Sequence, residues 1–261
     1  MTATESKNLM DNPRETLAAS MLYEYRLGEL GKEFALRNLM PVIVKGQAIV
    51  DLAFPQDEIR LSSDIDLLVG EDETSIAAAL IEIGYQENPP HSRHFGFGER
   101  GFYQQHEQRL PEYVEVHRCL DKILLRPIPY GDILARAKPS GRAGFRYPAI
   151  EDLLLLVVLH ASADIFFDEA RIQRDLRFLI EHGKPDMDTV QLRAKQWGLS
   201  RALDRLSNQS YPPKTNNSHR WSTPKTVFYL ANQWFWHDSP ATFLKGLAKY
   251  SIARLLDRLF P

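Results

Sequence analysis

The hydrophobic pattern divides this 261-residue chain into two parts. In the first part, short runs of β-branched or alternating apolar residues predict strands, and segments with helical spacing separate them. The expected strands cover residues 41–44, a run within 61–70, and 113–117, with a hairpin strand within 88–107, and the expected helices cover 14–40, 48–54 and 74–84. After Pro148 the pattern is helical, with helices expected over 148–163, 171–182 and 188–198. The chain therefore predicts an α+β fold.

Several elements carry finer predictions. The helix at 74–84 is expected to have Thr74 as its N-cap and Gly84 just after its last turn. Polar residues at 207–223 predict a linker or long loop, and a last helix at about 241–260 is expected to close a carboxy-terminal bundle; membrane or partner binding is the alternative. The first helix is expected to bury one apolar stripe, formed by Leu17, Met21, Tyr25, Leu27, Leu30 and Phe34.

Two acidic residues stand on one predicted strand. Asp64 and Asp66 are two positions apart, so their side chains point to the same face. Two like charges held together on a buried strand are unfavourable unless a cation neutralises them, and hard oxygen ligands suit Mg²⁺ carrying phosphate. An edge strand that turns both carboxylates to water is the alternative. On the strand at 113–117, Glu115 can supply a third carboxylate, and His117 either orients it, contacts a phosphate or is structural.

The chain breaks at Lys45-Gly46-Gln47 between the first strand and the next helix. A glycine turn between strand and helix can cradle a phosphate, because the backbone approaches closely and the helix offers free N–H groups. An ordinary turn is the alternative, since neither the P-loop nor the Rossmann glycine pattern is present. Lys45 is either a phosphate-binding cation or a solvent-facing residue at the end of a strand.

These motifs carry a resemblance to a known family. Lys45-Gly46, the run from Ser63 to Val69, and Glu115-Val116-His117-Arg118 resemble the core of the nucleotidyltransferase superfamily typified by DNA polymerase beta. More narrowly, they resemble the bacterial uncharacterised nucleotidyltransferase family, over about residues 22–180. The resemblance implies a mixed-sheet nucleotidyltransferase domain over residues 1–147 and an α-helical domain over 148–261.

The resemblance also implies a set of functional residues. By this resemblance, Asp64, Asp66 and Glu115 would be the catalytic residues and would bind Mg²⁺ (or Mn²⁺). Glu115, the third acid, would help to activate the incoming hydroxyl. The NTP would contact Lys45, Gly46, Gln47 and Ser63. The superfamily turn is usually Gly-Gly or Gly-Ser, and Gly46-Gln47 departs from it.

The expected function is metal-dependent transfer of a nucleoside monophosphate from an NTP to an acceptor, with release of pyrophosphate. A small molecule, a sugar, a peptide or a protein side chain could be the acceptor. Two alternatives stay open: a phosphotransferase that uses the same site, and a nucleotide-binding or toxin–antitoxin-type module without turnover. In the helical part, Arg171 either pairs with Asp175 on a solvated face or, like Arg174, reaches the triphosphate.

Composition narrows the class of protein. A formal net charge of −2 gives no bulk attraction to nucleic acid, which argues against a long polyanionic substrate. The single cysteine, Cys119, excludes an internal disulfide framework and a cysteine-rich zinc site, and the His91 and His94 pair sits in a predicted loop with no zinc assigned. No apolar run is long enough to span a bilayer and the amino terminus lacks a signal core, so a cytoplasmic location is expected.

Overall fold

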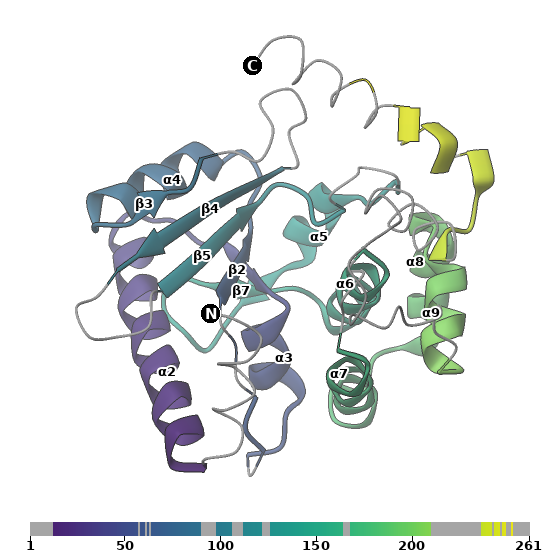
Figure 1. Ribbon diagram of the computed structural model, residues 1–261, viewed down its shortest axis with the longest axis horizontal. Helices are drawn as coiled ribbons and strands as arrows, with labels where there is room; N and C mark the ends of the chain where they lie inside the picture. The colour runs from purple at the N-terminus through teal and green to yellow at the C-terminus, as the bar shows by residue number, and fades with distance from the viewer. Residues whose placement is uncertain are drawn as a thin grey trace, which may run out of the picture.

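The computed structural model describes residues 13–56, 58–60, 62, 64–89, 98–105, 112–121, 126–163, 168–209, 236–241, 243–245, 247–248 and 252. Across these ranges, a mixed β-sheet and its helices form the first part of the chain, and helices form the part after residue 150 (Figure 1). The α+β class expected from the sequence is confirmed. None of the described helices is long and apolar enough to cross a membrane.

The described strands form a seven-stranded sheet in the order β3-β4-β5-β2-β1-β7-β6. In chain order the strands are β1 (Val42–Val44), β2 (Asp64–Leu68), β3 (Gln86–Glu87), β4 (Glu99–Gln104), β5 (Glu112–His117), β6 (Lys138–Pro139) and β7 (Arg146–Tyr147). Strand β2 runs parallel to β5 and antiparallel to β1, so the sheet is mixed. The hairpin strand expected within 88–107 is confirmed as β4.

The register around β2 brings distant parts of the sequence together. In the parallel pair, Asp66 lies opposite Glu115, and in the antiparallel pair it lies opposite Val44. Because Lys45 follows Val44 directly, the turn after β1 lies beside Asp66. The sheet thus gathers residues from three separate motifs around one point.

The two faces of β2 and β5 have different environments. Ile65 and Leu67 alternate with the acidic residues of β2 and are buried in the core with Val114 and Val116 of β5. Helices α2 (Pro13–Leu36) and α4 (Glu73–Glu82) pack against each other, and α4 contacts β5 (Figure 1). The apolar face therefore anchors both strands.

The helical part is built around α6 (Ile150–Ala163), whose residues 153–159 are almost completely buried. It contacts α7 (Glu169–Glu181), α8 (Met187–Trp197) and α9 (Ser200–Ser207). Helix α3 (Gly46–Ala53), which starts at the Lys45 turn, packs against both α6 and α7 and joins the helical part to the sheet. Helix α5 (Tyr130–Arg136) precedes the last two strands. The domain boundary at residue 147 stays a prediction.

The structure corrects the prediction of a single stripe on the first helix. Leu27, Leu30 and Phe34 of α2 are buried, but Leu17, Met21 and Tyr25 are 50%, 64% and 64% exposed. With 3.6 residues per turn, the two groups lie on different faces of the helix, so one face cannot bury both.

Some other boundaries differ from the expected ones. The N-cap of helix α4 is Asp72, two residues before the expected Thr74, whereas Gly84 follows the C-cap with a positive φ of 98°, as expected. In the described part of the last helix, which was expected to close a bundle, Phe243 is buried but Leu244 and Ile252 are 57% and 60% exposed. Ser63, His91 and His94 lie outside the described residues, as does the expected linker beyond residue 209.

Candidate functional site

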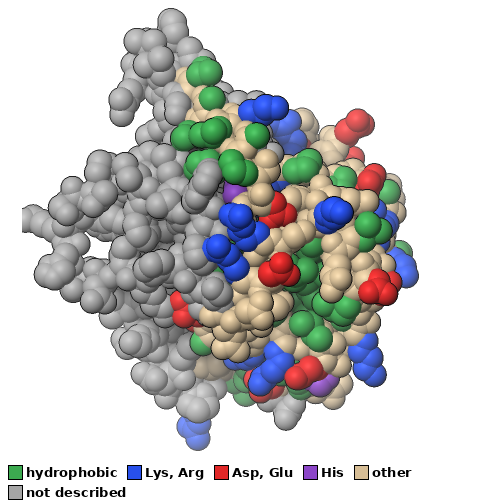
Figure 2. Space-filling model, turned by 90° about the vertical axis from the view of Figure 1, so that its right-hand side faces the viewer, with side chains coloured by type: hydrophobic (Ala, Val, Ile, Leu, Met, Phe, Trp, Pro, Cys, Tyr) green, Lys and Arg blue, Asp and Glu red, His purple; other side chains and the backbone are tan. Residues whose placement is uncertain are grey.

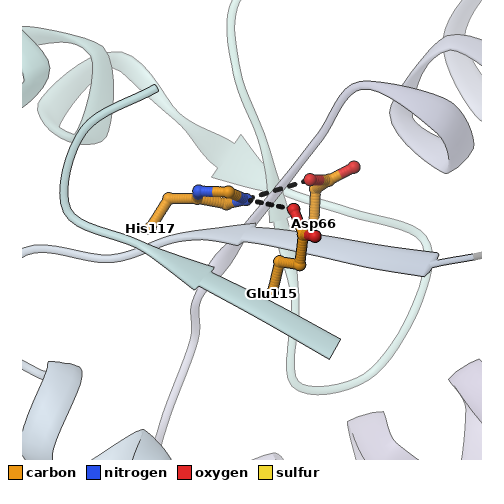
Figure 3. Close-up of side chains that lie close together, drawn as sticks. All are labelled: Asp66, Glu115 and His117. Atoms are coloured by element: carbon orange, nitrogen blue, oxygen red, sulfur yellow. Dashed lines mark hydrogen bonds and ion pairs between the residues drawn. The ribbon is translucent and has the colours of Figure 1, made fainter. Parts of the chain in front are cut away.

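Three side chains converge on the polar face of β2 and β5: Asp66, Glu115 and His117 (Figure 3). His117 Nε2 lies 2.9 Å from Asp66 Oδ1 and 3.3 Å from Glu115 Oε2. One potential ligand atom from each residue lies within 4.8 Å of the other two. A group of two carboxylate oxygens and one imidazole nitrogen at this separation can hold a divalent cation.

Lys45 adds a positive charge to these three residues. Its Nζ lies 2.6 Å from Asp66 Oδ1, the same oxygen that His117 approaches. The Lys45 backbone has φ 57° and ψ −135°, a region that favours glycine and is strained for a residue with a side chain. This conformation starts α3, and the ammonium group points into the acidic cluster instead of facing solvent at the end of the strand.

The charges within the cluster stabilise one another. Burial opposes ionisation of Asp66, but Lys45 and His117 hold the pKa of Asp66 well below its usual range. Burial likewise opposes ionisation of Glu115, but its contact with His117 lowers the pKa of Glu115. Burial disfavours the charged forms of His117 and Lys45. The neighbouring carboxylates nevertheless raise the pKa of both residues above their usual values. Two acids thus balance two cations only while the imidazole keeps its second proton.

Asp64 stands at the start of the same strand, two residues before Asp66. The Tyr23 hydroxyl donates a 3.1 Å hydrogen bond to the Asp64 backbone carbonyl and fixes this end of β2 to α2. The Asp64 carboxylate is not part of the set of ligand atoms that lie within 4.8 Å of one another. Its charge contributes to the raised pKa of Lys45 and opposes the lowering of the Arg171 pKa by burial and Arg60, so it borders the cluster. Metal binding by Asp64 stays a prediction.

The space beside the glycine of the turn is filled by the protein itself. A β-carbon at Gly46 would lie 2.4 Å from Ser62 Oγ and 3.0 Å from Arg60 Nη1. A larger residue at position 46 would therefore force the Ser62 and Arg60 side chains to move, whatever else approaches the turn. The Gln47 side chain is buried, and its Nε2 donates to Glu24 Oε1 at 2.8 Å and to Asp51 Oδ1 at 2.9 Å. Nucleotide contacts by Gly46 and Gln47 stay predictions.

A buried ion pair connects the sheet part to the helical part. Arg60, four residues before Asp64, donates from Nε at 3.0 Å and from Nη2 at 2.8 Å to the two oxygens of Asp175 on α7. The simpler sequence interpretation expected Asp175 to pair with Arg171. Asp175 pairs with Arg60 instead. Burial and the positive charge of Arg60 lower the pKa of Arg171, and the negative charge of Asp64 acts in the opposite direction. Arg171 is therefore a half-buried cation of α7 in the electrostatic field of Asp64.

Two features of the site were missed at the level of sequence. His117 was expected on the same strand face as Glu115, but not as a third member of a ligand set with Asp66. The ion pair between Arg60 and Asp175 joins residues 115 positions apart, and the only local indication is an arginine shortly before the acidic strand. Both features depend on pairing between distant segments.

The fold has distant relatives among solved structures. The structure is similar to JHP933 from Helicobacter pylori, with 14% identity and a TM-score of 0.41 over 92% of this chain and 97% of that one. It is also similar to the Megavirus polyadenylate synthase, with 14% identity and a TM-score of 0.41 over 88% of this chain and 43% of that one. Similarity at this level carries no functional argument. No curated protein matches the chain.

The family comparison covers most of the chain. The model of the uncharacterised nucleotidyltransferase family matches residues 4–207. This range includes the Lys45 turn, both strands of the acidic cluster and helices α6 to α9. The chain therefore belongs to the uncharacterised nucleotidyltransferase family, within the nucleotidyltransferase superfamily.

Proposed function

We propose that this protein is a metal-dependent nucleotidyltransferase that moves a nucleoside monophosphate from an NTP to an acceptor. The observation that carries the proposal is the convergence of Asp66 and Glu115 from neighbouring strands, beside Lys45 and bordered by Asp64. Family membership supports the same class of reaction. The donor set fits the expected metal, because two ionised carboxylates in a small volume favour Mg²⁺ or Mn²⁺.

Asp66 and Glu115 would hold the metal, with Asp64 as a further acidic ligand on the same strand face. When bound, the ion supplies neutralisation of the phosphate charge and a fixed position for the reacting oxygens. The Asp66 side chain is 6% exposed, whereas that of Glu115 is 30% exposed. Of these two acids, Glu115 is therefore the one that a substrate can reach more easily. We propose that Glu115 accepts the proton of the acceptor hydroxyl.

The acceptor oxygen forms a bond to the α-phosphorus, and the bond from that phosphorus to the bridging oxygen of the β-phosphate breaks. The electron pair leaves with pyrophosphate, so the leaving group gains negative charge that nearby cations stabilise. We assign this role to Lys45 from the turn and Arg171 from α7, because among the described residues both feel the negative charge of Asp64. Gly46, Gln47 and Ser63 complete the proposed nucleotide contacts.

The charge pattern on one face of the helical part bears on the class of acceptor. On the described part of the helical face, Lys and Arg side chains are interspersed with Asp and Glu and form no single basic stripe (Figure 2). Together with the net charge of −2, this pattern favours a small molecule, a peptide or a protein side chain as acceptor.

Two labelled substrates separate this function from its alternatives. The protein is incubated with Mg²⁺ or Mn²⁺, an acceptor-containing cell extract, and NTP labelled at either the α- or the γ-phosphorus. A nucleotidyltransferase moves the α-label to an acceptor and releases pyrophosphate. A phosphotransferase, which would use the same cluster, moves only the γ-label, and a nucleotide-binding or toxin–antitoxin-type module moves neither.

The matched variants are Asp66→Asn in the cluster and Asp204→Asn, an exposed aspartate of α9. We expect α-label transfer to be lost in the first and retained in the second. Transfer that survives in Asp66→Asn would refute the assigned site.

A further inference from the structure

The imidazole of His117 is buried between acidic groups in a way that a site made only of carboxylates does not explain. Its side chain is 1% exposed, and its Nε2 faces oxygens of both Asp66 and Glu115. Its Nδ1 is buried without a hydrogen-bond partner and lies 3.8 Å from Glu99 Oε2. A buried polar atom without a partner is costly, so its placement calls for a reason.

The spacing around Nε2 matches that of adjacent ligands on one ion. In a six-coordinate site with bonds of about 2.1 Å, neighbouring ligand atoms lie roughly 3 Å apart. The distances from His117 Nε2 to Asp66 Oδ1 and Glu115 Oε2 are 2.9 Å and 3.3 Å. Both distances are compatible with adjacent ligand positions on one ion, and one potential ligand atom of each residue lies within 4.8 Å of the other two.

A carboxylate lies near Nδ1, on the side where a metal-bound histidine needs an acceptor. A metal-ligating imidazole almost always donates its other N–H to a carboxylate, a carbonyl or water, which fixes the orientation of the ring. Glu99 of β4 lies directly opposite His117 in the β4–β5 pair. Its carboxylate is within about one ångström of hydrogen-bonding distance from Nδ1.

We propose that His117 is a direct metal ligand through Nε2, together with Asp66 and Glu115, with Glu99 as the group that orients the ring. The site then prefers Mn²⁺ to Mg²⁺, because an imidazole nitrogen suits first-row transition ions whereas Mg²⁺ is bound mainly by oxygen. The proposal deepens the proposed function, on which it rests for the presence of a divalent metal. It names the class of ion that the reaction would use.

Pulsed electron paramagnetic resonance of the full chain with one equivalent of Mn²⁺ tests the assignment directly. We expect hyperfine coupling to the nitrogen of a directly bound imidazole. This coupling should change from a ¹⁴N to a ¹⁵N pattern when the histidines are labelled with ¹⁵N. We expect the coupling to vanish in His117→Gln and to persist in His182→Gln, a matched change at an exposed histidine after α7. Titration calorimetry should show Mn²⁺ affinity falling roughly 10- to 100-fold in His117→Gln, with Mg²⁺ affinity changed much less.

Two results would overturn the assignment. One is Mn²⁺ bound to the wild-type protein in a Glu115-dependent manner without imidazole coupling, which would make His117 a group that only positions the carboxylates. The other is the absence of Mn²⁺ binding altogether. Because the wild-type spectrum shows whether any imidazole is bound to the ion, misfolding of His117→Gln cannot hide an absence of coupling. Loss of nucleotidyl transfer with the coupling intact would instead refute the proposed function and leave the ligand assignment standing.

Discussion

Two buried aspartates of this protein, Asp152 and Asp66, have opposite surroundings. Asp152 of α6 is completely buried and accepts hydrogen bonds from Arg136 Nε at 2.9 Å and from Arg193 Nη1 at 2.9 Å. Arg193 also lies 3.9 Å from Glu151, so two guanidinium groups balance two carboxylates. Guanidinium stays charged under all ordinary conditions, and this group of residues is a structural connection between helices.

Asp66 is surrounded by groups whose charge can change or move. Its partners are Lys45 and His117, and Glu115 and Asp64 are further acids nearby. When the imidazole is neutral, acids outnumber cations here, and a divalent ion restores the balance. The comparison teaches that burial of a carboxylate does not mark a functional site in this protein. The feature that sets the proposed site apart is a local surplus of acid next to a strained lysine backbone.

The largest effect on stability should come from the paired aspartate. Asp152→Ala leaves two guanidinium groups facing a buried cavity, and we expect the free energy of unfolding to fall by about 3–5 kcal/mol. Mn²⁺ affinity should be unchanged in the folded fraction. Denaturant unfolding and metal titration measure the two quantities, and a loss below about 1 kcal/mol would remove the contrast with Asp66.

In the cluster around Asp66, substitution of an acid should affect metal binding more than stability. Glu115→Gln removes one ligand and the negative charge that faces His117, so Mn²⁺ binding should weaken by about 10- to 100-fold while the metal-free protein loses at most about 1 kcal/mol of unfolding free energy. Thermal unfolding with and without Mn²⁺ reports both effects, because a ligand that binds only the folded state raises the unfolding temperature. Glu181→Gln, at an exposed end of α7, is the matched control. A destabilised metal-free Glu115→Gln with unaltered Mn²⁺ binding would assign Glu115 a structural role.

The turn next to Asp66 should be sensitive to packing. Gly46→Ala places a methyl group 2.4 Å from Ser62 Oγ, and we expect a loss of about 1–3 kcal/mol in unfolding free energy. Adding Ser62→Gly should recover part of that loss in chemical denaturation. If the double variant is no more stable than Gly46→Ala, contact with Ser62 is not what requires the glycine. Nucleotide affinity is interpretable only in the rescued protein.

The smallest effect on metal binding is expected at Lys45, where substitution should raise the Mn²⁺ affinity instead of lowering it. Lys45→Met removes an ammonium group that competes with a metal for Asp66 Oδ1, so Mn²⁺ should bind roughly threefold to tenfold more tightly. NTP should bind more weakly, since a phosphate contact is lost. Calorimetry of Lys45→Met and of the exposed Lys195→Met measures both affinities. Weaker Mn²⁺ binding in Lys45→Met alone would show that Lys45 supports the site instead of competing for it.

The sequence predicted those parts of the site that depend on local periodicity. The two-residue period of a strand places Asp64 with Asp66, and Glu115 with His117, before any pairing is known. Which strands pair, and in which register, depends on the whole sheet. The contact between Asp66 and His117 therefore appears only in the structure.

Other features depend on three-dimensional context in different ways. The positive φ of Lys45 belongs to a residue type that seldom adopts it, so composition gives no indication of it. The partner of Asp175 is Arg60 on a distant loop, where local helical spacing favoured Arg171. On α2, apolar residues in sequence looked like one stripe although they lie on two faces of the helix.

A crystal structure of the protein with Mn²⁺ and a non-hydrolysable NTP analogue, measured at the manganese absorption edge, tests the central claim most directly. We predict an anomalous peak bonded to Asp66 and Glu115, with the triphosphate beside the Lys45-Gly46 turn. An anomalous peak and a nucleotide bound away from β2 and β5 would contradict the assignment of this acidic cluster as the active site.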